Sequence, residues 1–180
     1  MTLEEFKQSV LSIIEEYSEN ADLLTDDDDI GNKLNFAINN IINEVARFKK
    51  INAKIEVDVT EEQELTFEEI DKKMYQLNII RGVDYDRIED TIIFNEDGTA
   101  KIYYYKYPES ITADTEDSYV FELTNDALEV AIIGVAGLIL SSDVSNQYGA
   151  IYTNMYKEKL NTLDPRNAIS SVSIDGSIEI

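Results

Sequence analysis

The sequence predicts a mainly α-helical protein with a small β insertion. We expect a four-helix bundle-like core, a β-hairpin and an extended C-terminal tail. Apolar residues recur at helical intervals toward both ends of the chain, and β-branched and aromatic residues alternate in its middle. No repeat or linker divides the 180 residues. We therefore expect a single domain over residues 1–163, followed by a tail over residues 164–180.

The first two predicted helices span about residues 3–20 and 29–50. Thr2 and Glu5 have the spacing of a capping box at the start of the first helix. The second helix has the longer apolar series, with asparagines on its opposite face. Its apolar residues are Ile30, Leu34, Ile38, Ile41, Ile42, Val45 and Phe48.

The β insertion is predicted over about residues 54–107. Lys54–Thr60 alternates as a short strand does. Thr91–Phe94 and Thr99–Tyr107 are expected to pair as a hairpin through the turn at Asn95–Gly98. For residues 67–77 two interpretations remain, a helix of one to three turns or an extended segment that begins near Met74.

The last predicted strand carries aromatic side chains on both faces. Tyr103, Tyr105 and Tyr107 fall on one face, and Ile102, Tyr104 and Lys106 fall on the other. This pattern indicates burial on both faces, or burial on one face and contact with a partner on the other.

Two further helices are predicted over about residues 125–141 and 145–163. Gly134 and Gly137 lower the helix propensity of the first and permit a close helix crossing. The second helix carries tyrosines at four-residue intervals, which suit either core packing or a partner surface. Beyond Pro165 the chain alternates in the manner of a strand, and we favour its addition to a neighbour's sheet over an edge position within this domain. The predicted partner-binding residues are Tyr148, Tyr152, Tyr156, Ile169, Val172, Ile174, Ile178 and Ile180.

The composition argues against most catalytic chemistries. The chain has neither cysteine nor histidine, and it lacks the glycine-rich phosphate loops. The acids Asp26–Asp29 are consecutive, whereas a calcium loop needs staggered ligands and a closing glutamate. We therefore expect no enzyme, no catalytic residues, no cofactor and no metal.

Charge and hydropathy also limit the partners that the chain is expected to bind. The net charge of −22 argues against a phosphate-binding surface. The N-terminus has acids where a signal peptide needs basic residues. The most apolar run, Ala131–Leu140, has 10 residues, against about 20 needed to cross a bilayer, so we expect no membrane contact.

The order of these elements resembles that of head–tail connector adaptors of tailed bacteriophages. Lys101–Ile111 is similar to the family's stretch of strand, aromatic residues, proline and isoleucine, and the acidic linker Asp114–Asp117 follows it. The apolar helix over Asp126–Leu140 and the segment from Ser142 to Leu160 come next in the family's order. Asp29–Asn39 resembles its second helix.

The resemblance implies a virion protein of the phage neck that assembles in the host cytoplasm. Such adaptors form a ring, usually of twelve subunits, that bridges the portal to a stopper or tail-completion protein. DNA passes through the lumen without specific binding, and the C-terminal segment docks on the portal. An alternative from another class is an acidic DNA-mimic inhibitor of a DNA-binding protein, since the net charge fits that function equally well.

Overall fold

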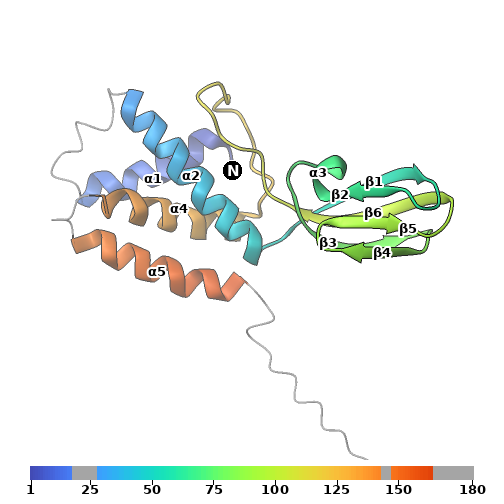
Figure 1. Cartoon of the computed structure of the whole chain (residues 1–180). Coiled ribbons are helices and arrows are strands. Elements are labelled where there is room, and N and C mark those ends of the chain that lie inside the picture. The colour runs from blue at the N-terminus through green and yellow to red at the C-terminus, as the bar shows by residue number, and fades with distance from the viewer. Residues whose placement is uncertain (18–27, 143–146, 164–180) are drawn as a thin grey trace, which may run out of the picture.

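A computed structural model describes residues 1–17, 28–142 and 147–163 (Figure 1). The helices are α1 (Leu3–Tyr17), α2 (Asp28–Phe48), α3 (Phe67–Ile70), α4 (Asn125–Leu140) and α5 (Gln147–Leu163). The strands are β1 (Ile51–Val59), β2 (Glu64–Thr66), β3 (Met74–Arg81), β4 (Tyr85–Ile88), β5 (Thr91–Phe94) and β6 (Gly98–Lys106).

The predicted fold class is wrong, because the inserted segment is larger and more regular than one hairpin. Its six strands form two three-stranded antiparallel sheets, with the orders β1-β6-β3 and β2-β5-β4. The protein is therefore an α+β protein rather than a mainly α-helical one. Figure 1 shows α1, α2, α4 and α5 on one side and the strands with α3 on the other, with α2 and the segment after β6 joining them.

The predicted hairpin is also wrong in its pairing. Strand β6 lies between β1 and β3, so both of its backbone edges are already occupied. Strand β5 pairs with β2 and β4 in the other sheet. The turn at Asn95–Gly98 therefore carries the chain from one sheet to the other, and the backbone N–H of Glu61 donates to Asp97 Oδ1 at 2.7 Å beside it.

The two sheets share one core and form a sandwich. Residues from both sheets contribute to it, with Ile92, Phe94 and Ile102 fully buried. A single turn of helix, α3, closes one end of this sandwich. Thr66 and Glu69 form a capping box there, and the chain is extended from Met74 onward. The two interpretations of residues 67–77 thus each describe one half of the segment.

Alkaline pH is expected to destabilise the sandwich through Tyr104. Burial raises the pKa of this phenol to about 12, helped by the hydrogen bond that its hydroxyl donates to Asp71 Oδ2 at 2.9 Å. In the unfolded chain the pKa returns to about 10, so the stability contributed by the neutral phenol is complete below pH 10 and lost as the pH rises to 12. The midpoint of urea unfolding should fall across this window, and less so in Tyr104→Phe. An equal fall in both proteins would contradict this assignment.

The other four helices form a unit around α4. Helix α4 packs against α1, α2 and α5, and most of its residues are buried. The predicted helices agree with α1, α2, α4 and α5 within about two residues wherever the structure describes them. At the start of α1 the predicted capping box is present, with Thr2 N donating to Glu5 Oε2 at 2.9 Å and Glu5 N donating to Thr2 Oγ1 at 3.2 Å.

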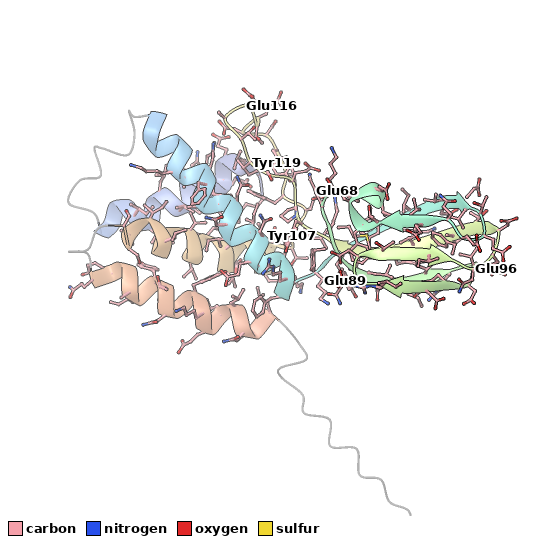
Figure 2. The ribbon with its side chains drawn as sticks, in the orientation of Figure 1. Glu68, Glu89, Glu96, Tyr107, Glu116 and Tyr119 are labelled. Carbon is pink, nitrogen blue, oxygen red and sulfur yellow. The ribbon has the colours of Figure 1, made fainter. Side chains whose placement is uncertain are left out.

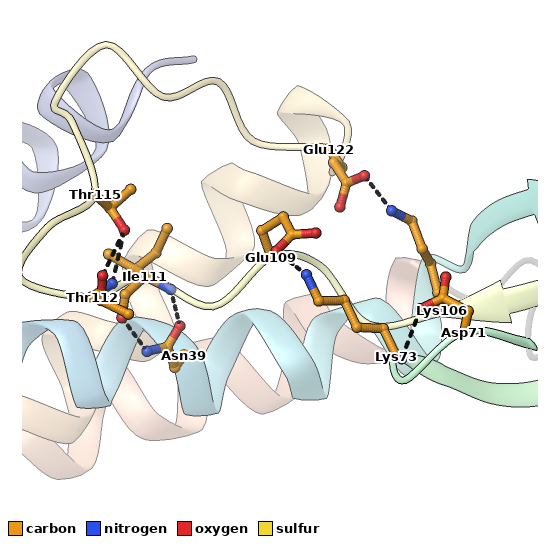
Figure 3. Close-up of polar contacts among 9 residues, drawn as sticks. All are labelled: Asn39, Asp71, Lys73, Lys106, Glu109, Ile111, Thr112, Thr115 and Glu122. Carbon is orange, nitrogen blue, oxygen red and sulfur yellow. Dashed lines mark hydrogen bonds and ion pairs between the residues drawn. The ribbon is translucent and has the colours of Figure 1, made fainter. Parts of the chain in front are cut away.

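Polar and aromatic contacts join the sandwich to the end of α2. Tyr75 and Tyr107 stack with ring centroids 4.6 Å apart, and the Tyr75 hydroxyl donates to the Ala46 carbonyl at 3.0 Å. Arg47 donates to the Tyr107 hydroxyl through two nitrogens, at 2.7 and 3.0 Å. Two ion pairs, Lys73–Glu109 and Lys106–Glu122, lie along the returning chain (Figure 3).

Asn39 holds the chain on its way back to the helices. Its Nδ2 donates to the Ile111 carbonyl and its Oδ1 accepts from the Ile111 N–H, both at 2.7 Å (Figure 3). A single side-chain amide thus satisfies both backbone groups of a residue that is 2% exposed. The contact fixes where the segment after β6 crosses α2.

Removing this amide is expected to cost about 2 kcal/mol, because Asn39→Ala leaves the N–H and carbonyl of Ile111 without their partner. Urea unfolding measures the change. The matched control is Asn40→Ala on the exposed side of the same helix, which should stay within about 0.5 kcal/mol of wild type. Equal effects of the two substitutions would show that the amide does not hold the loop.

Candidate functional site

The three tyrosines predicted to bind a partner lie on α5, toward the helical core. Tyr156 is 5% exposed, and its hydroxyl donates to Glu44 Oε2 on α2 at 2.8 Å. Burial and this hydrogen bond both raise the pKa of Tyr156. Tyr148 and Tyr152 are half-buried and pack against the same core. Their role in binding a partner stays a prediction.

The other predicted partner-binding residues belong to the tail. Ile169, Val172, Ile174, Ile178 and Ile180 lie outside the described residues. Their role stays a prediction based on the alternating pattern of the sequence.

The described part of the chain offers little that resembles a catalytic centre. None of its charged side chains is buried, and no three of its carboxylates converge as a metal site requires. A hollow of about 520 Å³ beside α3 opens to solvent and is lined by Thr66, Phe67, Glu68, Lys72, Met74, Tyr75 and Asp90. A carboxylate-based hydrolase would need two acids held across an enclosed cleft.

A surface that the sequence indicated only in part runs along β6. Ile102 and Tyr104 face the sandwich core, being 0% and 6% exposed. Tyr103 and Tyr105 point to the outer side of the sheet and are half-buried there. The strand therefore has one fully buried face and one that is partly exposed, and contact of the second face with a partner stays a prediction.

Cationic side chains cover the rings of these outer tyrosines. Lys50 Nζ lies 4.3 Å from the centroid of Tyr105, and Lys54 Nζ lies 5.7 Å from that of Tyr103. Arg81, from β3 on the other side of β6, lies 5.6 Å from the Tyr103 centroid. Each contact contributes about 0.5–1 kcal/mol at an exposed site, and together they place positive charge over aromatic surface.

We call this surface the tyrosine–cation face and define it by its residues on the outer side of sheet β1-β6-β3. These residues are Lys54, Ile79, Arg81, Lys101, Tyr103 and Tyr105. The strand register places two acids on the same side, Glu56 and Asp58. Glu56 pairs with Lys54, which lowers the pKa of its carboxyl group, and Asp58 accepts a hydrogen bond from Thr99 at 2.8 Å.

The positive character of this face depends on pairing between distant parts of the chain. Lys54 and Arg81 flank Tyr103 because β1 and β3 pair with opposite edges of β6. In the sequence, the alternating tyrosines allowed burial on both faces or burial on one face with a partner on the other, and nothing placed Lys54 and Arg81 beside them.

Comparisons with known proteins leave the family open. No protein-family model matches the chain, and no curated protein matches it significantly. Within the three described segments, no helix combines the length and the apolar character needed to cross a membrane. The fold and surfaces thus define an α+β protein with an accessible aromatic and cationic sheet face.

Proposed function

We propose that this chain is a head–tail connector adaptor of a tailed bacteriophage, a structural protein of the virion neck that assembles in the host cytoplasm. It forms a ring of twelve subunits that binds the portal on one side and the stopper or tail-completion protein on the other. The ring surrounds the passage through which DNA moves.

The observation that carries this proposal is the arrangement of a helical unit and an inserted module. Helices α1 and α2 precede the β-sandwich and α4 and α5 follow it; the adaptor resemblance implies this order of helices, but with a smaller β insertion. The sandwich protrudes from the helices (Figure 1), so the subunit offers separate surfaces for separate neighbours. The sequence after α5 alternates apolar and polar residues, a pattern that suits pairing with a sheet of the portal.

Deleting residues 169–180 is expected to abolish docking on the portal, because the deletion removes every apolar side chain of the predicted docking strand. Co-expression with the portal protein, followed by affinity capture and electron microscopy of ring particles, measures docking. Circular dichroism should show an unchanged helical signal.

A matched pair of variants separates the docking side chains from the length of the tail. Replacing Val172, Ile174 and Ile178 with serine should abolish capture, whereas Ser173→Ala with Ser177→Ala, on the alternate positions, should retain it. Capture that survives loss of the apolar residues would refute the role of the tail.

The acidity of the chain suits a passage for DNA. Twelve subunits of −22 would give a ring of about −264, and a negative lumen repels the phosphates that must slide through it. Binding to duplex DNA at low salt tests this part of the proposal. We expect no measurable complex, and tight, salt-sensitive binding would contradict it.

Portal capture also distinguishes the adaptor proposal from the DNA-mimic alternative. A DNA mimic would form a small complex with a basic DNA-binding protein, and the portal would not capture it. Such a result would replace the adaptor proposal.

A further inference from the structure

Charge is distributed unevenly over the two outer sides of the sandwich. The tyrosine–cation face carries Lys54, Arg81 and Lys101 around an apolar centre, where Ile79 is 40% exposed beside Tyr103. Its acids are Glu56 and Asp58, and the pair of Glu56 with Lys54 cancels one charge of each sign, which leaves Arg81 and Lys101 against Asp58. This side of the module is therefore locally basic in a chain of net charge −22.

The opposite outer side of the sandwich is acidic. On the outer side of sheet β2-β5-β4, Glu64 and Asp86 flank Ile93, and Ile88 is 62% exposed in the neighbouring row. We call these four residues the acidic face. Further acids surround it in the adjoining turns, among them Glu62, Glu89, Asp90 and Glu96. Figure 2 shows Glu89 and Glu96 at the surface of the strand module.

The cation within this second sheet is turned away from the acidic face. Arg87 pairs with Ile92, whose side chain is in the sandwich core, so the alternation of strand β4 points Arg87 to the inner side. Its guanidinium lies 4.9 Å from the centroid of the Phe67 ring. Arg87 is exposed at the edge of the sheet, and the strand residues on the outer side include no cation.

The two faces lie on opposite sides of one module, because the inner sides of the two sheets share a core. A subunit can therefore use both faces at once, each with a different neighbour. A contact of this kind joins unlike surfaces, and it repeats from subunit to subunit until a ring closes or a filament grows.

We propose that the tyrosine–cation face of one copy of this chain binds the acidic face of the next copy. The inference rests on the proposed ring and deepens it by naming the contact between neighbouring subunits. Ile79 and Tyr103 would meet Ile88 and Ile93 at the centre, and lysine and arginine would meet the surrounding carboxylates. An apolar centre with complementary charge around it is the usual composition of a protein interface.

The apolar centre and the acids of the face itself favour this occupant over nucleic acid. Aromatic and basic side chains on a sheet also suit single-stranded DNA. A nucleic acid, however, would approach a molecule of net charge −22 and meet Glu56 and Asp58 on the face itself. A second copy has the same net charge, but it offers the apolar residues Ile88 and Ile93 between its carboxylates, which a phosphate backbone lacks.

The test is self-association of the full chain, measured by sedimentation velocity over a concentration series. Lys54→Glu with Arg81→Glu should weaken association about tenfold or more, because it sets acids against acids. Glu64→Lys with Asp86→Lys should weaken it similarly by setting cations against cations. An equal mixture of the two double variants should associate again, since each then meets a face of opposite charge.

Lys157→Glu with Lys159→Glu is the matched control, since these exposed lysines on α5 change the net charge equally and should leave association intact. A wild-type chain that stays monomeric throughout, or a mixture that fails to recover, would overturn the inference. Binding of a single-stranded oligonucleotide that is lost in Lys54→Glu with Arg81→Glu would overturn it in favour of nucleic acid.

Portal capture, measured separately, distinguishes the two proposals. If the portal captures the chain but the double variants self-associate as the wild type does, the adaptor function stands and this contact is refuted. Association that depends on both faces, without portal capture, would support this contact and refute the adaptor function.

Discussion

Phe94→Ala is expected to destabilise the protein by about 3–5 kcal/mol. Phe94 is 0% exposed and lies in strand β5, where its ring helps fill the core between the two sheets. Truncation to alanine removes the ring from an apolar environment and leaves a cavity that strands paired on both sides of β5 cannot close. Urea unfolding, followed by tyrosine fluorescence and circular dichroism, measures the loss.

The control for this substitution is Phe36→Ala. Phe36 is 67% exposed on α2, so the same truncation there should change the free energy of unfolding by no more than about 0.5 kcal/mol. Similar losses at the two positions would show that the two sheets do not share a packed core. The proposed opposite placement of the two charged faces would then lose its basis.

Gly137→Leu is expected to cost about 3 kcal/mol by forcing α4 and α5 apart. A Cβ atom at Gly137 would lie 2.9 Å from the backbone nitrogen of Thr153 and 3.1 Å from the carbonyl carbon of Tyr152. These atoms belong to the backbone of α5, so a rotamer change cannot relieve the contact. Overpacking of this kind is strongly destabilising because close-packed helices must separate to accommodate it.

Ala150→Leu on the exposed side of α5 is the matched control, since it adds the same side chain where there is room. Thermal unfolding should show a large fall in the midpoint for Gly137→Leu and a small change for the control. If Gly137→Leu unfolded at the wild-type temperature, α4 and α5 could not be in the close contact described here.

The helices were predictable because their signals are local. The start of α4 at Asn125 and the capping box at Thr2 follow from residues within one turn of each other. The alternation of Tyr103 and Tyr104 between the two sides of β6 follows equally from neighbouring residues, whereas the sequence left open whether one side or both are buried. Where the structure describes these features, the predictions hold.

The failures share one cause, which is pairing between residues distant in the chain. The turn chemistry at Asn95–Gly98 indicated a hairpin, but β6 reaches its partners at Ile51–Val59 and Met74–Arg81 instead. A turn-forming sequence shows where the chain reverses and leaves open which strand comes to lie beside it. The fold class was missed for the same reason, since the strands near residues 64 and 85 carry only three or four residues each.

The sequence by itself determined the four long helices, the alternation along β6, the net charge of −22 and the apolar pattern of the tail. Only the tertiary structure decided that Lys54 and Arg81 cover Tyr103 on one side of the module, and that Glu64 and Asp86 flank Ile93 on the other. Helical periodicity depends on residues close together in the sequence, and net charge is a sum over the whole chain. The sign of charge on a surface depends on strand pairing, which joins residues that the sequence keeps far apart.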